Sequence, residues 1–255
     1  MDDLVAGLRL WPYFCRLGYD DISQRYVRTA LGPFWMIITS GVWIFMMALV
    51  SAGLFKQRLI DAFPFVATGM YGWIFMNTCF AESTQSILGQ SWLLTAASLP
   101  RSFHIWRTVV RITIMILHYI PVLFAILLFC EKWPTLHYLL LIPAIACFVW
   151  LGLWLSLILG PLALRFRDLP HVVTTLCAAV PLLSPIVWPR QALNQYAWIA
   201  DVNPVFHFVE LMRAPLLGTW PTAANWGVVI AVNAAGLACG YATFVSTKSR
   251  LALWA

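Results

Sequence analysis

Long apolar stretches alternate with short polar segments along the chain. Each stretch is close to the roughly 20 residues that a helix needs to cross about 30 Å of hydrocarbon. Six of them are present, at Pro33–Phe55, Phe63–Phe80, Val109–Phe129, Tyr138–Leu164, Val172–Val187 and Trp226–Val245. They are continuously apolar and lack the alternation of polar and apolar positions that membrane-spanning strands show. The pattern predicts an all-α integral membrane protein with six transmembrane helices.

The segment before the first apolar stretch shows a different spacing of apolar residues. Apolar residues recur at intervals of three, four and seven, at Leu4, Leu8, Trp11, Cys15 and Ile22. Because Arg and Asp residues lie between them, this pattern predicts an amphipathic helix on the membrane surface. The helix serves either as an anchor or as a contact surface for a cytoplasmic partner. Asp20 and Asp21 are expected to form a solvated turn.

The segment of residues 189–224, between the fifth and sixth stretches, is apolar but interrupted. Pro204, Pro215 and Pro221 divide it into parts that are too short to cross a bilayer. Irregular backbone at membrane depth requires shelter from protein or from a cavity. We therefore expect two short re-entrant periplasmic helices here. The chain then forms one transmembrane domain, residues 1–255, with an amphipathic start (1–32), spans one to five (33–188), the re-entrant segment (189–224) and span six with its tail (225–255).

Composition and charge place these elements in a membrane. Of the 255 residues, 62% are hydrophobic and 10% are charged, whereas soluble domains have about half and a quarter. Eleven of the sixteen Lys and Arg residues lie on the side of the termini: Arg9, Arg16, Arg25, Arg28, Arg101, Arg107, Arg111, Arg165, Arg167, Lys248 and Arg250. Because basic residues accumulate in cytoplasmic loops, the chain is expected in the inner membrane with both termini in the cytoplasm.

Two further expectations follow from this topology. The net charge of +6 reflects the cytoplasmic loops and requires no nucleic acid partner. The first apolar stretch begins too late and is too long for a cleaved signal peptide, so it is expected to act as the insertion signal itself.

Motifs for cofactor binding are missing from the sequence. None of the three lysines, Lys56, Lys132 and Lys248, follows a glycine, so there is no G-x-x-x-x-G-K-[ST] phosphate loop. The five His and six Cys residues show no metal-ligand spacing. No predicted span carries a charged residue at its middle, where ion-coupled transporters place one. The chain is therefore expected to bind no metal or cofactor, and any use of ATP and Mg²⁺ would require a separate chain.

Aromatic residues are unusually numerous, with 14 Trp and 16 Phe. Aromatic rings offer a rigid surface that loses little conformational entropy on binding, so those of the first two spans are candidates for lining a substrate channel. The candidate channel residues are Phe34, Trp35, Trp43, Phe45, Tyr71, Trp73 and Phe75. Placement in interfacial belts or against lipid explains the same residues equally simply.

Three segments carry more specific patterns. Arg25–Trp35 reads RYVRTALGPFW, Arg165–Asp168 reads RFRD, and Asn203–Arg213 reads NPVFHFVELMR. In this order they resemble the RYRRSxLGPFW, RxRD and NPxxHxxExxR segments of the membrane subunits of ABC-type polysaccharide exporters, which move O-antigen, capsule and teichoic acid chains. Val27 and Thr29–Ala30 depart from the first pattern. The resemblance extends over nearly the whole chain.

The resemblance implies partners and a coupling surface. It implies a homodimer that works with two copies of a cytoplasmic ATPase, sits among membrane lipid and moves lipid-linked polysaccharide. The cytoplasmic segment Glu82–Thr108 carries apolar residues that a solvated loop would not need. They either form a coupling helix that enters a groove of the ATPase or fold onto the membrane surface. The candidate coupling residues are Arg25, Tyr26, Trp92, Leu99, Pro100 and Arg101.

Two charged segments are candidates for gating or for the exit. The RFRD segment follows a helix C-terminus, where cations complement the helix dipole, and it is either a positive-inside anchor or part of a gate. Glu210 and Arg213 are three residues apart on one helix face and predict an ion pair; the resemblance places them near the exit. The gating and exit set is Arg165, Arg167, Asp168, Asn203, Pro204, Glu210 and Arg213.

The leading functional hypothesis is a channel-forming subunit of an ATP-driven exporter of lipid-linked, O-antigen-like polysaccharide, without enzymatic activity of its own. A drug or small-lipid exporter of the same design is the alternative. An intramembrane lipid or sugar transferase is less favoured, because the sequence contains no G-x-S-x-G motif and no metal–carboxylate constellation.

Overall fold

The structure is a computed structural model that describes residues 2–27, 32, 34–89, 91 and 99–254. Within these ranges the chain forms helices and no strands, and the prediction of an all-helical membrane protein is confirmed. The elements before the bundle are α1 (Asp2–Arg9) and α2 (Trp11–Tyr26). The bundle contains α3 (Phe34–Phe55), α4 (Leu59–Leu88), α6 (Phe103–Phe129), η1 (Leu136–Leu140), α7 (Leu141–Arg165), α8 (Leu169–Leu183) and α11 (Ala223–Thr247). Between the last two lie η2 (Arg190–Tyr196), α9 (Trp198–Val202) and α10 (Pro204–Leu216), and η3 (Lys248–Arg250) and α12 (Leu251–Trp254) end the described chain.

Five helical segments of the described chain are long and apolar enough to cross a membrane: Ile37–Phe55, Leu59–Leu88, Phe103–Phe129, Leu136–Arg165 and Ala223–Trp254. The fifth predicted stretch corresponds to α8, which has 15 residues and, at about 1.5 Å per residue, is shorter than the hydrocarbon layer. It ends because Ser184 adopts an extended conformation and Pro185 cannot continue the helix. The sixth crossing therefore stays a prediction.

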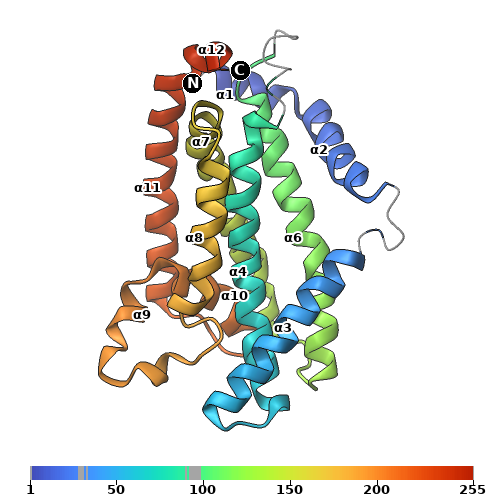
Figure 1. Ribbon diagram of the computed structural model, residues 1–255, viewed down its shortest axis with the longest axis vertical. Coiled ribbons are helices and arrows are strands. Elements are labelled where there is room, and N and C mark those ends of the chain that lie inside the picture. The colour runs from blue at the N-terminus through green and yellow to red at the C-terminus, as the bar shows by residue number, and fades with distance from the viewer. Residues whose placement is uncertain (1, 28–31, 33, 90, 92–98, 255) are drawn as a thin grey trace.

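Helix α4 forms the centre of the bundle and packs against α3, α6, α7, α8 and α10 (Figure 1). Its buried rings of Tyr71 and Phe75 contact Tyr119 of α6 and Phe148 of α7, with ring centroids 5.7–6.3 Å apart. Aromatic side chains thus fill the middle of the single chain: Tyr71, Phe75 and Phe148 are fully buried, and Tyr119 is half-buried beside them.

Small residues bring α7 close to both α4 and α6. The hydroxyls of Ser83 and Ser156 lie 2.9 Å apart, and a Cβ added at Gly152 would lie 2.7 Å from Ile112 Cδ1. At Gly160 an added Cβ would collide with Ser86 Oγ. Small residues and interhelical hydroxyl bonds are the usual means of packing helices in lipid, where apolar association alone gives little.

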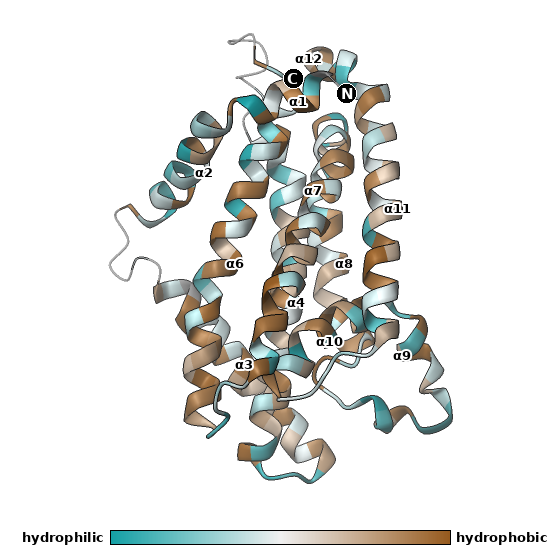
Figure 2. Ribbon diagram, turned by 180° about the vertical axis from the view of Figure 1, so that it is seen from behind, coloured by the Kyte–Doolittle hydropathy of each residue, from teal (hydrophilic) through white to brown (hydrophobic). Residues whose placement is uncertain are grey.

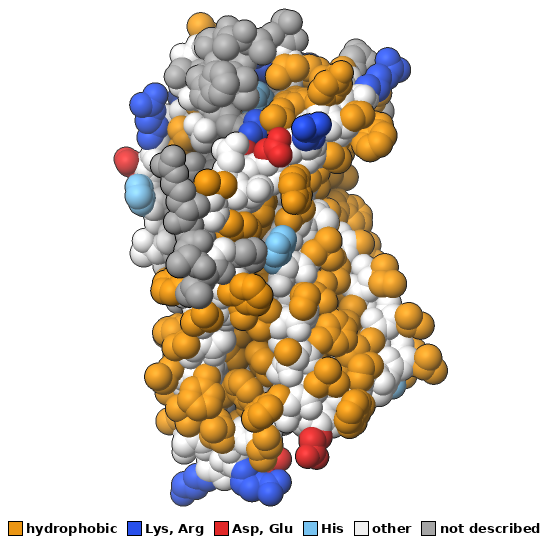
Figure 3. Space-filling model, turned by 90° about the vertical axis from the view of Figure 1, so that its right-hand side faces the viewer, with side chains coloured by type: hydrophobic (Ala, Val, Ile, Leu, Met, Phe, Trp, Pro, Cys, Tyr) orange, Lys and Arg blue, Asp and Glu red, His pale blue; other side chains and the backbone are white. Residues whose placement is uncertain are grey.

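The surface of the bundle matches a membrane setting. Apolar residues predominate along the long helices, and polar residues concentrate toward the ends (Figure 2). On the face shown in Figure 3, hydrophobic side chains cover the middle and Lys and Arg gather near the two ends. Both ends of the described chain lie at one end of the bundle, and α9 and α10 lie toward the other (Figure 1). We call these the terminal end and the opposite end.

Candidate functional site

Helices α1 and α2 are docked along the start of α6 at the terminal end. The carboxylate of Asp3 accepts hydrogen bonds from the backbone N–H groups of Arg101 (3.0 Å) and Ser102 (3.2 Å), which precede α6. The ring of Phe14 stacks on Trp106 at 6.3 Å. The amphipathic N-terminal segment is therefore fixed to the first turns of α6.

The face of this segment that is buried within the protein coincides only in part with the predicted apolar stripe. Phe14, Gly18 and Ile22 are buried, whereas Leu8 and Trp11 are exposed. The reason is a break at Leu10, after which Trp11 and Pro12 begin a new helix, so that a single helical period does not continue across it. Contact of the exposed Leu8 and Trp11 side chains with the membrane surface stays a prediction.

Five charged side chains from three helices meet where α2 crosses α6. Arg107 Nε donates to Asp21 Oδ2 at 2.8 Å, and Arg111 Nη1 donates to the same oxygen at 3.1 Å. Arg111 Nε also donates to Glu82 Oε2 at 2.9 Å. Arg25 lies 2.7 Å from the other oxygen of Glu82. We call Asp21, Arg25, Glu82, Arg107 and Arg111 the charge cluster.

Because most side chains of the charge cluster are buried, each charge depends on its ionic partners. The side chains of Arg111 and Glu82 are only 4% and 8% exposed, and a buried charge that loses its partner is costly. Burial alone would raise the pKa of Asp21, but the hydrogen bonds and charges of Arg107 and then Arg111 hold it below its usual value. A cavity of about 270 Å³ opens beside the cluster, lined by Asp21, Gln24, Arg25, Gln85, Gly89 and Arg111.

Of this cluster, only Arg25 had been predicted as a functional residue. The expectation of a solvated turn at Asp21 is wrong, because Asp21 lies within α2 and binds two arginines. Arg107 and Arg111 had been counted only as topology signals. The available signal was the spacing of four residues in both Asp21/Arg25 and Arg107/Arg111, which places each pair on one helix face.

The other predicted coupling residues lie around the same region. Tyr26 faces the ring of His118 at 6.2 Å, and Leu99 and Pro100 are half-buried just before α6. Trp92 lies outside the described residues. The coupling role of this set stays a prediction.

A second candidate site lies at the opposite end, where Asn203 and Pro204 begin α10. The side chain of Asn203 accepts a hydrogen bond from the N–H of Val205 (3.0 Å) and donates to Ser184 Oγ (2.8 Å). An Asn cap followed by Pro in the first turn is a favourable helix start. Through its hydrogen bond to Ser184, the Asn203 side chain also connects α10 to the C-terminal cap of α8.

Arg213 is the most enclosed charge of α10, with 3% of its side chain exposed. It forms the predicted ion pair with Glu210 (2.8 Å) and donates to the carbonyls of Pro185 (3.0 Å) and Ile186 (2.6 Å). Its guanidinium also lies 4.0 Å from the centre of the Phe65 ring, a favourable cation–π contact. Gly69 makes room for it, since an added Cβ there would collide with the guanidinium.

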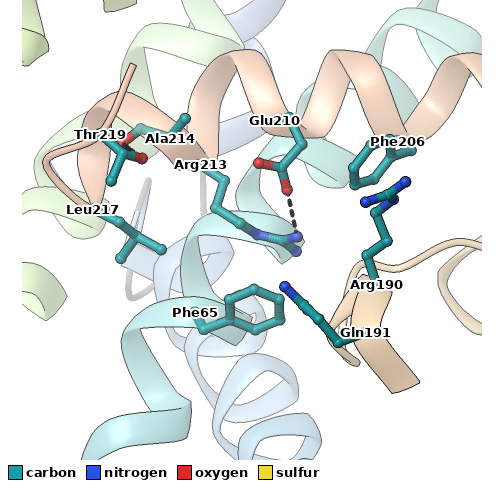
Figure 4. Close-up of a pocket in the computed structure, with 9 residues that line it drawn as sticks. All are labelled: Phe65, Arg190, Gln191, Phe206, Glu210, Arg213, Ala214, Leu217 and Thr219. Carbon is teal, nitrogen blue, oxygen red and sulfur yellow. Dashed lines mark hydrogen bonds and ion pairs between the residues drawn. The ribbon is translucent and has the colours of Figure 1, made fainter. Parts of the chain in front are cut away.

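Two cavities lie at this end of the bundle, and Arg213 lines the first of them. The first, of about 290 Å³, is lined by Phe65, Arg190, Gln191, Phe206, Glu210, Arg213, Ala214, Leu217 and Thr219 (Figure 4). The second, of about 300 Å³, is lined by Arg190, Asp201, Phe206, His207, Glu210, Thr222, Ala224, Asn225 and Val228. In its wall, His207 bonds Asn225 Oδ1 (2.9 Å) and the carbonyl of Asp201 (2.8 Å).

The predicted gating and exit residues fall into two groups. Arg165, Arg167 and Asp168 lie exposed between α7 and α8, where the guanidinium of Arg165 stacks on Phe166 and Trp254. The contact with Trp254 places this group at the terminal end. Asn203, Pro204, Glu210 and Arg213 belong to the site at the opposite end, so the two groups do not form a single gate in this chain.

The predicted channel aromatics are also divided. Phe34, Trp35, Trp43 and Phe45 of α3 are exposed, whereas Tyr71, Trp73 and Phe75 of α4 are buried in the core. Of the predicted channel residues, a single chain thus presents the four α3 rings on its surface. The channel role of the set stays a prediction.

Comparison with known proteins gives a consistent result. The profile of the family described as "ABC-2 type transporter" matches residues 14–217. An O-antigen export system permease protein RfbA of Myxococcus xanthus is 24% identical over 175 residues, which are 68% of this chain and 67% of the relative. A protein of the same name from Klebsiella pneumoniae is 24% identical over 195 residues, 76% of this chain and 75% of the relative. The resemblance seen in the three sequence segments is confirmed.

Proposed function

The chain belongs to the ABC-2 type transporter family, and we propose that it is the channel-forming subunit of an ATP-driven exporter of lipid-linked polysaccharide. Its apolar helices make it a multi-pass membrane protein. The similarity to O-antigen export permeases over two thirds to three quarters of the chain supports an O-antigen-like substrate.

The observation that carries the transport mechanism is the charge cluster. It joins α2, which lies off the bundle, to α4 and α6 within it (Figure 1). A force applied to α2 at the terminal end is thereby transmitted to the central helix of the bundle. In this proposal a separate ATPase chain, present in two copies and holding ATP and Mg²⁺, applies that force from the cytoplasm.

The packing of α4 supports a homodimer. Tyr71 and Phe75 are fully buried, so side chains fill the middle of one chain. A path wide enough for a glycan therefore belongs between two copies, bordered by exposed aromatic rings such as Trp35 and Trp43 of α3. The terminal end, which bears Arg165 and Arg167, faces the cytoplasm of the inner membrane in this arrangement.

Two measurements test the proposal. Mild solubilisation of a tagged chain is expected to recover an ATPase in equal amount, and deletion of the gene is expected to remove long glycans from the cell surface while lipid-linked glycan accumulates inside. Recovery of the chain without any ATPase would contradict the transport mechanism. Normal surface glycan together with retention of a drug or a small lipid would instead establish the other exporter class.

A further inference from the structure

The two cavities at the opposite end form a neighbouring pair that the coupling mechanism does not use. They share Arg190, Phe206 and Glu210 in their linings. Each has a volume near the lower limit of about 300 Å³ that is common for small-molecule sites. Figure 4 shows Phe65, Gln191, Arg190, Phe206 and Glu210 arranged around the space next to Arg213.

The charges in these linings favour a neutral ligand. Arg213 is paired with Glu210 at 2.8 Å, and Arg190 is paired with Asp201 at 2.5 Å. The four charged side chains thus balance each other. An anion or a cation would have to compete with an existing ion pair, whereas a neutral polar molecule can use the free hydrogen-bonding positions of the same groups.

Several of those positions are open. One oxygen of Glu210 accepts from Arg213, and its second oxygen has no donor among the described residues. The amide of Gln191 lies exposed in the first lining, and the hydroxyl of Thr219, which donates to the Ala214 carbonyl, can still accept. Planar carboxylate and amide groups next to a ring suit a molecule with adjacent hydroxyls and an apolar C–H face.

The walls are held rigidly. Arg213 binds two backbone carbonyls of the segment after α8, and His207 and Asn225 are buried and bonded to each other. The half-buried ring of Phe206 lies edge-on to His207 at 5.4 Å. Pre-organised polar groups of this kind reduce the entropy lost when a flexible ligand binds.

We propose that the two cavities form one groove that binds a short neutral saccharide, stacked on Phe206 and hydrogen-bonded by Gln191 and Glu210. The inference rests on the proposed function in one respect, since the exported glycan supplies the saccharide. The groove would hold a few sugar residues of the exported glycan at the end of the bundle away from the ATPase.

Binding can be tested with the full chain and its ATPase in lipid nanodiscs, applied to an array of bacterial O-antigen and capsule oligosaccharides. Wild-type protein is expected to bind at least one glycan. Phe206→Leu, which keeps an apolar side chain of similar packing, and Gln191→Ala are each expected to weaken binding about tenfold. Trp133→Ala serves as the matched control, because Trp133 is exposed and lies outside both linings.

The outcomes separate the groove from the transport proposal. Absence of glycan binding, equal binding by the groove variants, or displacement of glycan by inorganic phosphate would overturn the groove, even if the cells export glycan normally. Binding that depends on Phe206 and Gln191 would support the groove. If the same protein failed to export any glycan, the groove would stand and the proposed export function would fall.

Discussion

Arginine side chains are buried at both ends of the bundle, but different groups compensate their charge. In the charge cluster, Arg107 and Arg111 are held by carboxylates of α2 and α4, and Arg25 remains 45% exposed. At the opposite end, Arg213 is held by Glu210 of its own helix and by two backbone carbonyls. Contacts between side chains tolerate small displacements of their helices, whereas hydrogen bonds to fixed backbone carbonyls do not. In the proposed mechanism, the charge cluster is the joint that moves and the surroundings of Arg213 are a rigid wall.

The largest effect is expected from Arg213→Ala. It leaves the carbonyls of Pro185 and Ile186 and the carboxylate of Glu210 without their donor, at a cost of about 3–5 kcal/mol. Thermal unfolding of the detergent-solubilised chain, followed by fluorescence-detected size exclusion, measures it. A loss of stability below about 1 kcal/mol would show that Arg213 does not stabilise the cavity walls at the opposite end.

Glu82→Gln is expected to have the next largest effect. It removes the carboxylate that pairs with Arg25 and Arg111, and the partly exposed Arg25 limits the cost to about 2–3 kcal/mol. If the cluster is a joint, export should fall more than the amount of folded protein does. Arg58→Ala is the control, because Arg58 forms an exposed pair with Asp61 that contributes little. Equal loss of export and of folded protein would reduce the cluster to a structural role.

A glycine pair tests how tightly Arg213 is enclosed. Gly69→Ala places a methyl group against the guanidinium and 2.6 Å from the Ile186 carbonyl oxygen, with an expected cost of about 1–3 kcal/mol. Gly53→Ala, also within a helix, has no atom within 4 Å of the added carbon and should leave the unfolding temperature unchanged or slightly raised. Similar unfolding temperatures for the two variants would contradict the close packing around Arg213.

The smallest effect concerns pH. The folded pKa of Asp21 lies below its ordinary value of 3.8, so the unfolded state binds the proton more readily. The stabilisation from Asp21 is then complete above that ordinary value and is lost as the pH falls through the lower folded value. Protease cleavage near α2 should therefore be constant from neutral pH to about pH 5 and increase only in stronger acid. Asp21→Asn should remove the Asp21 part of this acid response, and a variant that keeps the full response would assign it to another group.

The candidate sites were only partly predictable. The pair Glu210/Arg213 was predicted because its spacing of three residues is local to one helix, and the ion pair confirms it. The four-residue spacing places Asp21 with Arg25 on one helix face and Arg107 with Arg111 on another. Asp21 and Arg107 are 86 residues apart, so the spacing does not indicate that these two faces meet. The buried positions of Tyr71 and Phe75 were likewise hidden, because a helix that is apolar on all sides gives no periodicity that separates core from lipid.

The sequence by itself determined that this is a helical membrane protein and approximately where its long helices lie, and three of its segments indicated a resemblance to ABC-type exporters. Transfer of a helix into hydrocarbon depends on the summed apolarity of about twenty consecutive residues, which can be read locally. The tertiary structure alone decided which arginines share carboxylates, which one binds backbone carbonyls, and which aromatic rings fill the core. Those outcomes depend on distances between segments far apart in the chain, because the energy of a buried charge is set by the groups within a few ångströms of it.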